Sequence, residues 1–182
     1  MSADAASTVT LHGVFLQIFD LGVLIAGDSG LGKSELALEL LSRGHRLVAD
    51  DAAEFTLENG RPIGRCPALL CGFLEVRGLG ILNIERMFGA QSLTPSHALD
   101  LVLRLLLPVD VAELSDRIHG QSRARPLLGV EVPEIALPIR LGHNLSALAE
   151  AACRNQMLKR DGYDAAEDFV LRQRLAIDNG GA

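Results

Sequence analysis

The stretch that decides the fold of this chain runs from residue 27 to residue 34 and reads Gly27-Asp28-Ser29-Gly30-Leu31-Gly32-Lys33-Ser34. It matches the phosphate-binding pattern G-x-x-x-x-G-K-[ST] in full, and we call it the P-loop. Its glycines let successive backbone N–H groups converge on phosphate oxygens, because no Cβ stands in the way. In such a loop the lysine, here Lys33, reaches the terminal phosphates, and the hydroxyl of Ser34 binds Mg²⁺. The sequence therefore predicts a nucleotide-binding site.

The residues around the P-loop fit a strand–loop–helix unit. An apolar strand at 22–26 enters the loop, and residues 34–43 carry the apolar stripe of a helix that Gly44 ends. Further strands are predicted at 8–11, 14–19, 46–50, 53–57, 61–66, 98–107 and 129–139. Residues 98–107 also fit a helix, but their β-rich context favours a strand. We expect Pro133 and Pro138 to interrupt the last strand.

The rest of the chain completes a prediction of one α/β domain with a mixed sheet and flanking helices. Two helices are predicted at its end, at 145–160, capped by Asn144, and at 165–177. Residues 115–126 are polar and aperiodic, which indicates a loop. The predicted domain covers 9–178, between flexible ends at 1–8 and 179–182.

Length and composition exclude several classes of protein. The 182 residues and 19.5 kDa fit a single domain. A net charge of −6 and few aromatic residues argue against nucleic-acid binding. No run approaches the ~18–20 apolar residues of a membrane span, and the first residues do not form a secretory signal. The three cysteines lack zinc-ligand spacing and fit reduced, mostly buried residues of a cytoplasmic protein.

Two carboxylates, Asp50 and Asp51, end the strand that follows the P-loop helix. The carboxyl edge of that sheet is where the phosphates of a nucleotide lie. Since adjacent strand residues point to opposite faces, we expect at most one of the two to face the site. That acid would hold magnesium or act as a general base toward a hydroxyl. A solvated turn pair at the sheet edge is the alternative.

Glu75 and Arg77 form a second patch, followed by Gly78 and Gly80. Two residues apart on an extended segment, the acid and the base share a face, and the glycines permit close backbone approach. This suits a magnesium ligand with a cation near phosphate, although an ordinary exposed ion pair fits as well. The polar loop also contains four basic residues, Arg117, His119, Arg123 and Arg125. They would clamp phosphate, dock an acidic partner or simply face solvent. By residue type alone, His12 fits a structural histidine, and Met87 and Phe88 fit the core.

Taken together, the motifs resemble the catalytic domain of bacterial HPr kinase/phosphorylase from about residue 9 to residue 175. The resemblance rests on His12-Gly13-Val14, the P-loop, the run Gly44-His45-Arg46-Leu47-Val48-Ala49-Asp50-Asp51 and the segment 74–84. Within that segment, Arg77-Gly78-Leu79-Gly80-Ile81 is unusual outside the family. The resemblance to this family implies a single P-loop domain with a nucleotide site like that of phosphoenolpyruvate carboxykinase. The family typically carries an additional N-terminal domain, so the chain looks like a short form with the catalytic domain alone.

Roles for individual residues follow from the resemblance. It implies that the P-loop holds ATP, that Ser34 and Glu75 bind Mg²⁺, and that Asp51 takes the proton from a substrate serine. Asp51 would work in the opposite sense during dephosphorylation. His12 matches an active-site histidine and Arg117 the catalytic arginine of a flexible loop. Residues 75–84 match the signature segment of the family, here Glu75, Arg77, Gly78 and Gly80 with their neighbours.

The segment associated with dephosphorylation corresponds to Pro138, Arg140, Gly142 and His143. The family usually ends it with Val-Gly-Arg, whereas this chain has Leu141-Gly142-His143. Histidine is shorter than arginine and titratable, so the kinase reaction is expected more firmly than its reverse.

The expected substrate is the small phosphocarrier protein HPr or a paralogue. The resemblance also implies a homohexamer in which the helix at 165–177 helps bind the substrate of another subunit. Two alternatives remain open from the sequence. One is a P-loop kinase of a small metabolite, and the other is a non-catalytic module that senses ATP.

Overall fold

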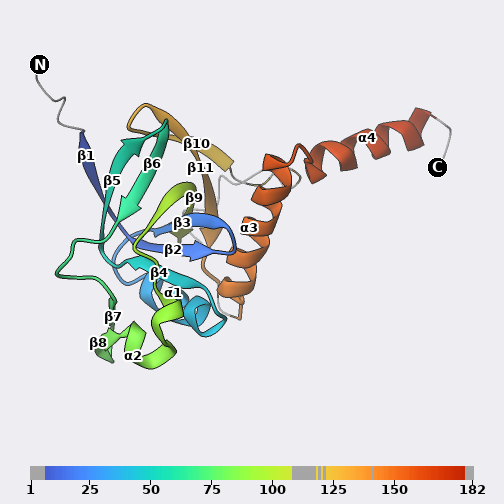
Figure 1. The fold of residues 1–182 in the computed structure, drawn as a ribbon. Coiled ribbons are helices and arrows are strands. Elements are labelled where there is room, and N and C mark those ends of the chain that lie inside the picture. The colour runs from blue at the N-terminus through green and yellow to red at the C-terminus, as the bar shows by residue number, and fades with distance from the viewer. Residues whose placement is uncertain (1–6, 108–117, 119, 121, 141, 179–182) are drawn as a thin grey trace, which may run out of the picture.

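A curled mixed sheet forms the body of the molecule (Figure 1). The computed structural model describes residues 7–107, 118, 120, 122–140 and 142–178. In this part of the chain the main path of the sheet runs through β1 (Thr8–His12), β5 (Ala52–Glu58), β6 (Arg61–Arg65), β9 (Ser96–Leu106), β3 (Leu21–Ala26), β2 (Val14–Ile18) and β4 (Arg46–Ala49). Two further strands, β10 (Ser122–Leu127) and β11 (Val130–Pro138), extend from β9. The predicted α/β class with a mixed sheet is confirmed.

Strand β9 organises this sheet because it pairs with three others. It runs parallel to β3 and β11 and antiparallel to β6. Its side chains Leu101, Val102, Leu103 and Leu105 are fully buried. The choice of a strand for residues 98–107 is therefore confirmed. Both faces of β9 are covered, so its side chains are apolar at successive positions instead of alternating between apolar and polar.

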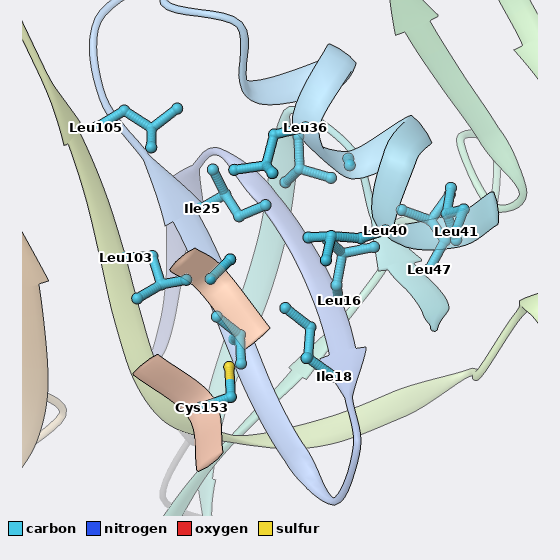
Figure 2. Close-up of a cluster of buried hydrophobic side chains, with 14 of the residues drawn as sticks. Leu16, Ile18, Ile25, Leu36, Leu40, Leu41, Leu47, Leu103, Leu105 and Cys153 are labelled. Atoms are coloured by element: carbon cyan, nitrogen blue, oxygen red, sulfur yellow. The ribbon is translucent and has the colours of Figure 1, made fainter. Parts of the chain in front are cut away.

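The P-loop joins β3 to helix α1 (Lys33–Ser42). Helices α1 and α3 (Leu145–Arg160) cover one face of the sheet. Figure 2 shows the apolar cluster between these helices and the sheet. Leu36 and Leu40 of α1 pack there against Leu16 and Ile25 of the sheet, and Cys153 contributes from α3. The helix ends where Gly44 adopts a φ of 94° and its N–H bonds the carbonyl of Leu41.

A second apolar cluster lies inside the curl of the sheet. The rings of Phe15 and Phe55 pack there with centroids 5.1 Å apart. A Cβ at Gly64 would lie 2.4 Å from the Phe15 ring, so this position requires glycine. Among the residues described, no helix contributes to this cluster.

The chain adds two elements to this body. One is a small hairpin of β7 (Phe73–Val76) and β8 (Gly80–Asn83), followed by α2 (Ile84–Phe88) and a 3₁₀ turn at Ala90–Ser92. Its buried Leu74, Val76 and Ile84 join the α1 cluster. The other is α4 (Ala165–Asp178), which extends away from the body and buries none of its residues (Figure 1).

Several local predictions were wrong. The loop expected at 115–126 includes residues 122–126, which belong to β10, because Arg123 and Arg125 pair with the buried Glu134 of β11. Neither proline interrupts β11: Pro133 precedes the residues that pair with β9, and Pro138 is the last of them.

Burial also differs from expectation at a few side chains. Met87 is half exposed, although Phe88 does pack against the core. Cys153 is buried, Cys66 is half-buried and Cys71 is exposed, so the expectation of mostly buried cysteines was wrong for Cys71. In the residues described, no helix is long and apolar enough to cross a membrane.

Candidate active site

The P-loop forms one wall of a cleft of about 210 Å³ at the end of β3. The rest of its lining comes from three separate segments. Gly13 and Val14 lie at the β1–β2 junction, Asp50 and Asp51 follow β4, and Glu75 and Arg77 come from the β7–β8 hairpin. The structure therefore brings together the P-loop and both acidic patches that the sequence singled out.

The P-loop has a backbone that ordinary side chains would strain. Gly27, Gly30 and Gly32 have φ values of 140°, 85° and 86°, in the region that favours glycine. The ammonium group of Lys33 donates to the carbonyl oxygens of Gly27 at 2.8 Å and Asp28 at 2.9 Å, so it folds back over the loop. Helix α1 starts directly behind, where helix N–H groups lack intrahelical partners. This combination suits a phosphate anion.

Asp50 and Asp51 occupy a tight turn, in which the N–H of Ala52 donates to the carbonyl of Asp50 at 2.7 Å. Asp51 has a φ of 62°, in the left-handed region. This conformation breaks the alternation of the strand, and both carboxylates line the cleft. The expectation that at most one of them faces the site was wrong, because it assumed extended backbone through Asp51.

His12 stands beside Asp51. Its Nδ1 lies 3.8 Å from Oδ1 of Asp51, and both side chains are more than four-fifths exposed, at 83% and 84%. The two residues meet because β1 pairs with β5 in a register that places His12 opposite Ala52. From residue type alone His12 fits a structural histidine, and its place at the cleft depends on that strand pairing.

Asp50 faces the hairpin. Its Oδ2 accepts a hydrogen bond from the backbone N–H of Glu75 at 2.8 Å. Burial raises the pKa of Asp50 above its ordinary value, and the neighbouring carboxylates of Asp51 and Glu75 act in the same direction. Hydrogen bonds from backbone N–H groups offset part of this rise in pKa. The sequence does not predict this contact, because 25 residues separate the two partners.

Glu75 and Arg77 both line the cleft, as their spacing predicts. The guanidinium group of Arg77 reaches across to the P-loop, where a Cβ placed on Gly30 would lie 3.3 Å from its Nη1. Gly78 and Gly80 have φ values of 87° and 83° and open space around them. They form the turn of the hairpin, and their use for close ligand approach stays a prediction.

Ile139, Gly142 and His143, from the segment associated with dephosphorylation, line a hollow beside Leu31 and Gly32 of the P-loop. His143 donates its N–H to the carbonyl of Arg140 at 3.1 Å, which makes a turn. Gly142 and His143 line this hollow with Gly32 and Glu35, and the last two also line the nucleotide cleft. Leu141 of this segment, and Arg117 and His119 of the polar loop, lie outside the described residues.

Mg²⁺ fits the polar groups of the cleft. Among the described residues, no group of three or more His, Cys, Asp and Glu side chains is arranged to hold a metal. Mg²⁺ needs no such cage, since it is usually bound by one or two protein oxygens, by phosphates and by water. Ser34 and the carboxylates of Asp50, Asp51 and Glu75 supply hard oxygens in the one cleft.

The fold and the cleft define the class of the protein: a P-loop α/β protein whose phosphate site faces a carboxylate pair. Residues 3–173 match the family model of the HPr Serine kinase C-terminal domain, and the chain belongs to this family. The resemblance inferred from the motifs is confirmed.

Curated relatives and a solved structure agree with this assignment. The HPr kinase/phosphorylase of Chromobacterium violaceum is 51% identical over 177 residues, which cover 93% of this chain and 54% of that protein. The protein of the same name from Xanthomonas campestris pv. campestris is 50% identical over 181 residues. This aligned region covers 98% of this chain and 57% of that protein. The chain thus spans about half the length of these relatives. The Hpr(Ser) kinase/phosphatase structure from Coxiella burnetii matches with a TM-score of 0.82 at 39% identity, covering 88% of this chain and 98% of that one.

Proposed function

We propose that this chain is an ATP-dependent protein serine kinase that phosphorylates the phosphocarrier protein HPr or a paralogue. The observation that carries the proposal is that the P-loop and Asp51 line one cleft, in a chain of this family. A phosphate site alone would serve many nucleotide-binding proteins. An exposed carboxylate in the same cleft supplies the base that a hydroxyl acceptor needs.

In the reaction, the P-loop binds the phosphates of ATP and Lys33 stabilises charge on the transferring group. Asp51 takes the proton of the substrate serine while the serine oxygen attacks the γ-phosphorus, and ADP leaves. His12 lies beside Asp51, with its Nδ1 3.8 Å from Oδ1 of the carboxylate. Arg77, beside Gly30, adds positive charge at the phosphates, and Arg117 has the same role by resemblance to the family.

Ser34 and Glu75 are the residues that we propose for Mg²⁺. When bound there, the ion neutralises negative charge on the phosphates. Glu75 is suited to this because it is held at the cleft through its own backbone, by Asp50.

A protein substrate suits the surroundings of the cleft. Leu79 and Ile81 on the hairpin are 66% and 64% exposed, next to Glu75 and Arg77. Apolar side chains left uncovered beside a reaction site favour a partner with its own apolar surface, such as a folded protein. A small polar metabolite would not use them.

The proposal includes the reverse reaction, dephosphorylation of the substrate, for which the residues of this chain give less support. Attack by inorganic phosphate on phosphoserine would need anion contacts from the Pro138–His143 segment, and His143 stands where the family usually has arginine. Its place beside Gly32 keeps it near the phosphates.

We also propose that α4 contacts another copy of the chain in a homohexamer. The support is that no residue of α4 is buried, with Phe169, Leu171 and Leu175 about half exposed. Sedimentation should give a mass of six times 19.5 kDa, and a smaller mass for Phe169→Asp. The three free thiols agree with a reducing compartment, and we place the protein in the cytoplasm.

The decisive experiment is transfer of label from [γ-³²P]ATP to purified HPr in the presence of Mg²⁺. Lys33→Ala and Asp51→Asn serve as matched variants, and excess inorganic phosphate is added afterwards. Serine-linked label that is lost in both variants is expected, and its release by phosphate would add the reverse activity. ATP binding without label on HPr or its paralogues would contradict the proposal. Turnover with a small acceptor would then indicate a metabolite kinase, and its absence an ATP sensor.

A further inference from the structure

The small hairpin that carries Glu75 and Arg77 is not part of the large sheet. Strands β7 and β8 pair only with each other in the described chain. Leu74 and Val76 anchor the hairpin by burial against the α1 cluster. Apolar burial is non-directional, so it holds the hairpin down without fixing where its polar face points. A directional contact is needed to aim Glu75 into the cleft.

Asp50 makes such a contact. Its carboxylate accepts the N–H of Glu75 at 2.8 Å, across a separation of 25 residues. A hydrogen bond to an ionised oxygen is stronger and geometrically stricter than one between neutral groups. In the antiparallel ladder of β7 and β8, Glu75 stands opposite Ile81, and its N–H is the one that points to Asp50. This bond therefore ties β7 to the residue that follows β4.

The same residue also shapes the turn of Asp51. The carbonyl of Asp50 accepts the N–H of Ala52 at 2.7 Å, and this closes the turn in which Asp51 has a φ of 62°. One residue thus lies between the proposed base and the proposed magnesium ligand. Its side chain acts on Glu75, and its main chain acts on Asp51.

We propose that Asp50 is a positioning residue, which sets the separation of Glu75 and Asp51 across the cleft through its bond to the Glu75 backbone. This inference rests on the proposed function for its catalytic consequence. Asp50 touches neither the acceptor nor the phosphates in this role. A displacement of about 1 Å at a reacting group lowers rates on the order of 100-fold, so a misaimed Glu75 is enough to slow transfer.

The competing role for Asp50 is direct: magnesium ligand or proton carrier. Two variants separate the roles. Asp50→Asn keeps an oxygen that accepts the Glu75 N–H but removes the charge and the titration, whereas Asp50→Ala removes the acceptor. A positioning role predicts that Asn rescues what Ala loses. A direct role predicts that Asn and Ala are equally impaired, because an amide is a poor magnesium ligand and no base.

The experiment measures transfer to HPr and amide hydrogen exchange on the same full-length samples. We expect Asp50→Ala to lower kcat about 10- to 100-fold with the KM for ATP within about threefold of wild type. Asp50→Asn should stay within about threefold in kcat and in the Mg²⁺ concentration that gives half-maximal rate. Exchange of the Glu75 amide should accelerate in Asp50→Ala and remain slow in Asp50→Asn. Asp20→Ala, at an exposed carboxylate in the β2–β3 turn, is the control for removal of an acid.

Two results would overturn the inference. One is an Asn variant as slow as the Ala variant while its Glu75 amide stays protected, which would assign Asp50 a direct chemical role. The other is equal Glu75 exchange in wild type and Asp50→Ala. If wild type transfers no phosphate to HPr, the proposed function fails, but the exchange comparison still decides whether Asp50 holds Glu75.

Discussion

One wall of the nucleotide cleft is made from consecutive residues, whereas the other is assembled from segments far apart in the chain. The P-loop runs without a break from Gly27 to Ser34, backed by α1 and its buried leucines. The other wall takes Gly13 from the β1–β2 junction, Asp51 from the end of β4 and Glu75 from a separate hairpin, with His12 beside Asp51. Its parts meet through contacts between distant residues, such as the 3.8 Å approach of His12 to Asp51 and the 2.8 Å bond from Glu75 to Asp50.

Under the proposed function, this difference separates binding from chemistry. The consecutive wall offers N–H groups and a lysine for phosphate, and it needs only its own backbone geometry and a helix behind it. The assembled wall carries the proposed acid–base and metal groups, whose spacing depends on three independent placements. Substitutions on the two walls should therefore have different kinetic signatures.

The largest effect is expected from Asp51→Asn. Removal of a general base lowers kcat about 100- to 10,000-fold. ATP affinity should stay within about twofold, because the phosphates are held by the other wall. Rapid-quench transfer assays and fluorescent-nucleotide titration measure the two quantities. An equal fall in ATP affinity would break the distinction between the walls.

Lys33→Ala, in contrast to Asp51→Asn, should lower the affinity for ATP. Loss of one positioned cation at the phosphates lowers kcat/KM about 100- to 1,000-fold, with weaker ATP binding as part of the loss. The matched control is Lys159→Ala, the one other lysine of the sequence, which pairs with Asp164 at 3.1 Å. Calorimetric titration with ATP should detect the loss only at Lys33. Unchanged ATP affinity in Lys33→Ala would count against a phosphate role for this loop.

The two walls should also differ in stability. Leu40 of α1 is fully buried behind the P-loop, and Leu79 on the hairpin is 66% exposed. Leu40→Ala should lower the free energy of unfolding by about 2–5 kcal/mol through lost burial and a cavity. Leu79→Ala should change it by less than about 0.5 kcal/mol. Urea unfolding followed by circular dichroism compares them, and similar losses would show that the hairpin is as tightly packed as α1.

Glu75→Gln tests the metal role on the assembled wall. The amide keeps the size of the side chain but removes the charge that favours Mg²⁺. The Mg²⁺ concentration for half-maximal transfer should rise about tenfold, in line with the 10- to 100-fold effects of perturbing a metal site. Glu54→Gln, on the exposed face of β5, is the control. An unchanged Mg²⁺ requirement would remove Glu75 from the metal site.

The smallest effect is expected from His12→Ala. The side chains of His12 and Asp51 are both exposed to solvent and 3.8 Å apart, so their interaction is screened. Such pairs are worth about 0.2–1 kcal/mol, which corresponds to at most about a fivefold loss of rate. A loss as large as that of Asp51→Asn, measured in the same transfer assay, would mean that His12 itself takes part in proton transfer.

The sequence by itself determined those features that depend on neighbouring residues. The P-loop, the strand before it and the helix after it follow from glycine conformations and from apolar spacing within a short window. That Glu75 and Arg77 both line the cleft also follows, because residues two apart on an extended segment share a face. The family could be recognised for the same reason, since its motifs are contiguous.

Only the tertiary structure decided how the distant segments meet. The strand register that places His12 opposite Ala52 brings this histidine to Asp51. Asp51 has left-handed backbone, and Asp50 and Asp51 both line the cleft, against the alternation expected of a strand. Arg123 and Arg125 lie on a strand rather than in a loop because a buried glutamate on β11 pairs with them. Local pattern sets local conformation, but contacts between segments far apart in sequence depend on the free energy of packing the whole chain, which no short window contains.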